Sequence, residues 1–277
     1  MKKKKNYHTE ISCNGSLVDT HCHLDMESYA DDLLEVIGRA KAARISHVIS
    51  IGIDIKSSKK AVLLAQRLSG IKAAIGIHPH YTDKVSEEDY QHLRSLHKKY
   101  PEHIVGYGEI GLDYAKKHAK PENQRRHFNR QLELARELNL PIIIHNRDAN
   151  AETLEILKTH TPFVRSGLMH CFSGDEKFAE DVIDMGLLIS IPGIVTFKNA
   201  PQLHRVVQSV PLEKMVLETD GPFLSPHPFR GKRNEPAHIL FTAQQVATLK
   251  GLNIDEVAEQ TSQNARRLFN LEKTQTL

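Results

Sequence analysis

Residues 17–25 read Leu-Val-Asp-Thr-His-Cys-His-Leu-Asp, an apolar pair followed by two histidines two positions apart. In an extended strand, side chains at positions i and i+2 leave the same face, so His21 and His23 can point at one centre while Cys22 points away. This geometry suits a metal ion. Because the chain contains 17 histidines, such a pair can also arise by chance. A metal site therefore depends on matching ligands from other strands.

The composition is that of a globular protein. The chain has 277 residues, of which 40% are hydrophobic and 26% charged, and at this length one α/β barrel is as plausible as two smaller domains. The net charge is +3, and four lysines at positions 2–5 account for more than that excess. The remaining chain carries no bulk positive charge that would indicate nucleic acid. An anionic substrate would have to be held locally, by metals or a few placed cations.

Residues 1–16 are expected to form a flexible basic tail, and residues 17–277 a single domain. The three cysteines, Cys13, Cys22 and Cys171, form neither an even disulfide framework nor a CxxC pair, which favours a reducing, cytoplasmic location. No apolar run reaches the length of a signal peptide or a membrane span. We therefore expect no membrane association.

Short apolar or β-branched runs alternate with segments of helical period along the chain. The runs are residues 17–20, 47–53, 71–77, 104–110, 141–144, 166–169, 187–191 and 214–217. A long loop is expected over 225–236 and two closing helices over 237–269. Eight strands with helices between them over this length predict a single-domain α/β protein with the (β/α)8 TIM-barrel fold.

Polar residues of the kinds that bind metals fall at corresponding places, near the ends of these runs. They are His21, His23, Glu109, His145, His170 and Asp220. In a TIM barrel, the carboxyl ends of the strands surround a common pocket where active sites lie. It is improbable that six side chains of ligand type would all fall at strand ends by chance. The pattern therefore predicts a metal centre.

The ligand types limit the metal. Nitrogen and carboxylate ligands without cysteine fit Zn, Mn, Co or Fe, and fit Mg less well because of the imidazoles. Six protein ligands exceed what one catalytic ion uses, since such an ion keeps an open position for water. Two divalent ions that share a bridging carboxylate account for the surplus.

The sequence resembles the TatD family of metal-dependent deoxyribonucleases, within the amidohydrolase-like metal hydrolases. The matching stretches are DTHCHLD (19–25), GIHPH (76–80), GEIGLDY (108–114), LPIIIHNRDA (140–149), HCFSG (170–174), ETDGPFL (218–224) and RNEP (233–236). Together they cover about residues 17–271. The resemblance implies that His21 and His23 bind the first metal with Asp220 near it. It also implies that His145 and His170 bind the second metal and that Glu109 bridges both.

The expected chemistry is phosphodiester hydrolysis by a water that two metal ions activate. Asp220 is expected to orient that water and accept its proton, with Glu109 as its catalytic partner. Candidates to bind the phosphate are His78, Arg147, Arg233 and Asn234, the arginines because guanidinium matches phosphate oxygens in pairs. Glu218 could hold a ligand histidine or pack at a strand end.

The expected substrate is DNA, as single strands or at 3′ ends, and the expected enzyme is a monomeric exonuclease. Aromatic residues make up 6% of the chain and tryptophan is absent, so the sequence shows no stacking platform for single strands. Two alternatives stay open. The same centre could hydrolyse amide, ester or lactone bonds, or the barrel could bind metal without turnover, which the number of ligands facing an open pocket disfavours.

Overall fold

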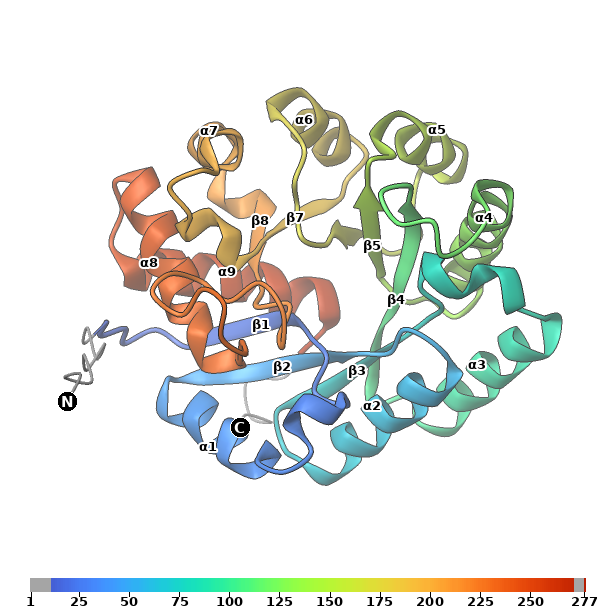
Figure 1. The fold of residues 1–277 in the computed structure, drawn as a ribbon, viewed down its shortest axis with the longest axis horizontal. Helices are drawn as coiled ribbons and strands as arrows, with labels where there is room; N and C mark the ends of the chain where they lie inside the picture. Colours follow the sequence, from blue (N-terminus) through green and yellow to red (C-terminus); the bar gives the residue numbers. More distant parts are fainter. Residues whose placement is uncertain (1–10, 272–276) are drawn as a thin grey trace.

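The structure is a computed structural model that describes residues 11–271 and Leu277. Eight parallel strands follow one another around a barrel in chain order (Figure 1). They are β1 Leu17–Cys22, β2 Ile45–Ile51, β3 Ile71–Ile75, β4 Ile104–Asp113, β5 Ile142–Arg147, β6 Gly167–Met169, β7 Leu188–Ile191 and β8 Met215–Leu217. The predicted TIM-barrel fold is confirmed, and each predicted strand exists with its ends shifted by a few residues.

Helices surround the strands on the outside of the barrel (Figure 1). They are α1 Leu33–Ala42, α2 Ile55–Arg67, α3 Glu87–Lys99, α4 Pro121–Glu137, α5 Asn150–His160, α6 Glu176–Asp184, α7 Pro201–Ser209, α8 Ile239–Lys250 and α9 Ile254–Phe269. The two closing helices, α8 and α9, were predicted. None of the helices among residues 11–271 is long and apolar enough to cross a membrane.

Local sequence explains where several helices begin. Asp54 caps α2, because its side chain accepts a hydrogen bond from Ser57 N at 2.7 Å. Asp54 N in turn donates to the Ser57 hydroxyl at 2.9 Å, which completes a capping box. Ser86 and Asp89 form a capping box at the start of α3. Such caps satisfy backbone donors that have no partner within the helix.

The barrel closes beyond the end of β8. Asp220 N donates to His21 O at 2.8 Å, and His23 N donates to Gly221 O at 2.7 Å. The Thr20 hydroxyl adds a hydrogen bond to Leu217 O at 2.9 Å. These bonds join the first strand to the last at the level of the histidine pair.

Helix α9 covers the opposite, amino-terminal end of the barrel. Leu268 and Phe269 of this helix pack in one buried cluster with inward-facing strand residues such as Val18, Ile143 and Val216. Because apolar side chains fill the interior and α9 covers this end, the carboxyl end of the strands is left for polar chemistry.

The structure describes only the second part of the segment 1–16, which was expected to be a flexible tail. Residues 1–10 lie outside the described residues. Residues 11–16 contact α9, where Asn14 N and Gly15 N donate to the carboxylate of Asp255 at 2.7 and 3.3 Å, and Cys13 is buried.

Gly111 is required where β4 passes β5. Its φ is +141°, and a Cβ added there would lie 1.9 Å from the carbonyl oxygen of His145. We expect Gly111→Ala to lower the free energy of unfolding by at least about 2 kcal/mol. The backbone of β4 or β5 would have to move to relieve the clash with His145 O. Gly38→Ala is the matched control, since no atom lies within 4 Å of its added Cβ and alanine favours helix α1 by up to about 1 kcal/mol. Urea unfolding measures both, and equal stability of the two variants would contradict the clash.

Candidate metal centre

Six side chains from five strands meet at the carboxyl end of the barrel. His21 lies in β1, Glu109 in β4 and His145 in β5, while His23, His170 and Asp220 follow β1, β6 and β8. All of them except His21 line one cavity of about 300 Å³, and His21 is fully buried. The structure thus brings together the six residues that the sequence selected as ligands.

His21 and His23 form one group of donors with two carboxylates. Their Nε2 atoms lie 3.3 Å apart. His21 Nε2 lies 3.5 Å from Glu109 Oε2 and 3.8 Å from Asp220 Oδ1, and His23 Nε2 lies 3.4 Å from the same Asp220 oxygen. Ligand atoms about 2.1 Å from a tetrahedral ion would lie about 3.4 Å apart. The spacing of these donors therefore fits one cation.

A second group surrounds the other oxygen of Glu109. Glu109 Oε1 lies 2.7 Å from His145 Nδ1 and 3.5 Å from His170 Nε2. His78 Nε2 lies 3.5 Å from the same oxygen. Glu109 therefore presents one carboxylate oxygen to each group of histidines, which is the arrangement that a bridging ligand needs.

The electrostatics of the centre favour a cation. Burial raises the pKa of Glu109, but the charges of His78 and His170 outweigh it and hold its pKa well below the usual range. Burial together with the neighbouring His170 lowers the pKa of His21 to about 3. The centre thus combines an anionic carboxylate with a neutral imidazole, which has one unprotonated ring nitrogen that can bind a cation.

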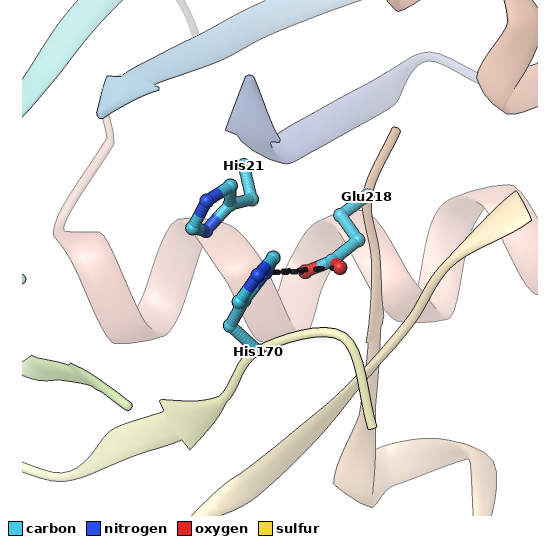
Figure 2. A group of neighbouring side chains, drawn as sticks. All are labelled: His21, His170 and Glu218. Carbon is cyan, nitrogen blue, oxygen red and sulfur yellow. Dashed lines mark hydrogen bonds and ion pairs between the residues drawn. The ribbon is translucent and has the colours of Figure 1, made fainter. Parts of the chain in front are cut away.

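His170 is held by a carboxylate on its far side. Figure 2 shows Glu218 directed at the ring of His170, whose Nδ1 lies 3.0 Å from Glu218 Oε2. The other oxygen of Glu218 accepts from Cys171 N at 2.9 Å. Burial lowers the pKa of His170, but Glu218 and Glu109 raise it to about 10. Of the two roles considered for Glu218, this contact favours orientation of a ligand histidine.

Asp113 is a polar residue of the centre that the sequence analysis did not select. One of its oxygens lies 3.1 Å from His145 Nε2 and 2.9 Å from His80 Nε2, and its side chain is 1% exposed. The other oxygen accepts from Lys116 N at 2.9 Å. Its position four residues after Glu109 in the same strand places both on one face, and this spacing was the available signal.

Of the four predicted phosphate-binding residues, one lines the cavity and another follows a candidate ligand histidine in its strand. His78 lines it, and its Nδ1 accepts from His80 N at 3.1 Å at the start of the 3-10 helix Pro79–Lys84. Arg147 is exposed at the end of β5, two residues beyond His145. Burial raises the pKa of the Cys171 thiol beside His170, and the Arg147 guanidinium opposes that shift. Both side chains are thus placed near the ligand histidines.

The other two are engaged by the protein itself. Arg233 donates to both oxygens of Asp32 at 2.7 and 2.6 Å. Asn234 is fully buried, and its amide donates to Thr219 O and Phe223 O, each at 2.7 Å. Contact of Arg233 and Asn234 with substrate stays a prediction. A substrate would have to compete with the hydrogen bonds that these side chains make within the protein.

The barrel and the converging imidazole and carboxylate donors define a class of protein, the metal-dependent hydrolases. The donors fit a divalent cation by their chemistry, since nitrogen and oxygen ligands meet around an anionic carboxylate. Comparison with known proteins gives the family. The model of the TatD related DNase family matches residues 18–270. The chain belongs to this family.

Three relatives show how far the similarity extends. The uncharacterized metal-dependent hydrolase YabD of Bacillus subtilis (strain 168) is 42% identical over 92% of this chain and 99% of its own length. The 3′-5′ ssDNA/RNA exonuclease TatD of Erwinia amylovora is 36% identical over 92% of this chain and 100% of its own. The crystal structure of YJJV, a TatD homolog from Escherichia coli K12, superposes with a TM-score of 0.88 at 30% identity, covering 92% of this chain and 98% of that one.

Glu218 gives a test of the support behind His170. We expect Glu218→Gln to weaken divalent-metal affinity about 10- to 100-fold, because the amide cannot accept from both His170 and Cys171 as the carboxylate does. Metal retained during titration with a chelator measures the effect. Glu213→Gln is the matched control, an exposed residue just before β8. Equal metal retention in the two variants would contradict the role of Glu218 in orienting His170.

Proposed function

We propose that this protein is a two-metal exonuclease that hydrolyses phosphodiester bonds at the 3′ ends of single-stranded DNA. The proposal rests on the position of the Glu109 carboxylate between two groups of histidines. Its Oε2 lies 3.5 Å from His21 Nε2, and its Oε1 lies 2.7 Å from His145 Nδ1. A carboxylate shared between two sets of ligands supports two ions, a common arrangement in nucleases. The name of the Erwinia relative supports the substrate and the direction.

The proposed ligand sets follow from the distances. His21, His23 and Asp220 would hold one ion, His145 and His170 the other, and Glu109 both. Zn, Mn or Co suits these imidazole-rich sets better than Mg does. When bound, such ions lower the pKa of a water and polarise a phosphate oxygen.

The residues of the chain would do the remaining work. Asp220 keeps 12% of its side chain exposed, so it can reach a water in the cavity, orient it and accept its proton. Arg147 would bind the non-bridging phosphate oxygens through its guanidinium, and His78 would donate a hydrogen bond from Nε2, because its Nδ1 accepts from His80 N. Asp113 and Glu218 would hold His145 and His170 in place.

We further propose that the enzyme acts as a monomer in the cytoplasm. All three cysteines are free, and Cys13 and Cys22 are buried. Unpaired thiols suit a reducing compartment.

The substrate class can be tested directly. The protein loaded with Mn, Zn, Co or Mg is incubated with single-stranded DNA labelled at its 5′ end, with the same strand labelled at its 3′ end, and with ester, lactone and amide substrates. The proposal expects the 5′-labelled strand to shorten step by step. Hydrolysis of carbonyl substrates with no cleavage of DNA would overturn it in favour of the alternative hydrolase.

The two-metal centre can be tested by counting ions. We expect Glu109→Gln to lose affinity for both ions and to lower the rate of DNA hydrolysis at least about 100-fold, because it removes charge shared by both sets. Elemental analysis after dialysis gives the ion-to-protein ratio. Glu155→Gln, on the exposed side of α5, is the control. Two ions per chain and full activity in Glu109→Gln would contradict the bridging role.

A further inference from the structure

Two aromatic side chains stand exposed at the mouth of the metal cavity. Among the described residues, the large hydrophobic side chains that are exposed are Leu34, Leu63, Tyr81, Val164, Phe223 and Leu252. Tyr81 and Phe223, at 43% and 49% exposure, are the aromatic members of that set. Both line the cavity that contains Glu109 and Asp220. We call these two residues the aromatic rim.

Tyr81 is tied to the second group of ligands. It lies in the 3-10 helix Pro79–Lys84, and its backbone N donates to His78 O at 3.0 Å. Its ring centroid lies 6.4 Å from that of His78, with the two rings near perpendicular at 71°. The backbone bond places the Tyr81 ring beside a histidine that approaches Glu109.

Phe223 is tied to the first group. Its backbone N donates to Asp220 O at 2.8 Å, and its carbonyl accepts from the buried amide of Asn234 at 2.7 Å. Its ring centroid lies 6.0 Å from that of His23. Two hydrogen bonds thus hold a half-exposed phenyl ring next to two proposed ligands.

Packing does not explain this placement. A single exposed aromatic ring is ordinary on a protein surface, but here the two exposed Phe or Tyr side chains among the described residues lie at the one cavity that contains Glu109 and Asp220. Nearly half of the surface of each residue is exposed, so neither serves mainly to fill the core. Exposed apolar area beside convergent polar groups is typical of a ligand site.

We infer that Tyr81 and Phe223 stack on unpaired nucleobases of the strand whose end lies at the metal centre, an inference that rests on the proposed nuclease function. Stacking on aromatic rings suits any base, because every base has a π-face. Bases in a duplex are covered by their neighbours, so the aromatic rim would select unpaired ends. The stacking platform that composition did not reveal is made of two residues 142 positions apart, brought to one cavity by the barrel.

The inference is tested with oligonucleotides that keep the phosphodiester and lack the bases. A single strand ending in normal nucleotides is compared with one whose last two nucleotides are abasic. We expect the wild-type protein to have a kcat/KM about 10- to 100-fold higher on the normal end. In the double variant Tyr81→Ala with Phe223→Ala, this ratio should fall toward one. Tyr81→Phe and Phe223→Tyr should restore it, and Leu34→Ala, at a residue 72% exposed on α1, should leave the ratio as in the wild type.

A binding measurement separates this inference from the proposed function. A strand ending in the fluorescent base 2-aminopurine, with its terminal linkages replaced by non-hydrolysable methylphosphonates, is titrated into the metal-loaded protein. Stacking should quench the fluorescence, and the double alanine variant should lose the quenching. DNA cleavage with no preference for normal ends and no quenching would overturn the aromatic rim alone. Quenching that depends on both rings without cleavage of any DNA would uphold the aromatic rim and overturn the nuclease proposal.

Discussion

The hydrogen bonds that close the barrel are the interaction on which the centre depends. Asp220 N to His21 O and His23 N to Gly221 O join β1 to the segment after β8 at 2.8 and 2.7 Å. They form at the same level as the side chains of His21, His23 and Asp220. Because backbone hydrogen bonds join the segments that carry these three candidate ligands, their side chains meet within 3.8 Å without a long flexible loop.

Closure is reinforced by Asp19, which is buried and accepts from Thr219 N at 2.9 Å. Burial raises the pKa of this carboxyl to about 7 despite its bonds to Thr219. A carboxyl in such a place is costly unless its partners are well oriented. Asp19 therefore helps to set the direction of the chain between Leu217 and Asp220, and with it the position of the last ligand.

The sequence predicted the barrel and the six candidate ligands because local patterns along the chain indicate both. Apolar runs mark the strands, and a polar residue such as His170 directly after a run, or Asp220 three positions after one, marks the carboxyl end. The sequence did not single out α3, α5 and α7, whose exposed faces are rich in polar residues, so the apolar stripe is narrow. Asp113, which contacts His145, was not selected because the predicted strand ended at residue 110, whereas β4 continues to Asp113.

Asn234 shows how a residue near the centre can act without reaching it. It was selected as a candidate to bind phosphate, yet its side chain is fully buried and its amide donates to Thr219 O and Phe223 O. These carbonyls stand on either side of Asp220, so one side chain braces the loop that carries both a ligand and an exposed ring. The partly exposed Arg233 to Asp32 pair adds little stability by itself. This pair connects the same loop to the start of α1, because Asp32 is the residue just before that helix. Order in this loop is what allows Phe223 to stay half exposed and still hold one position beside the metal ligands.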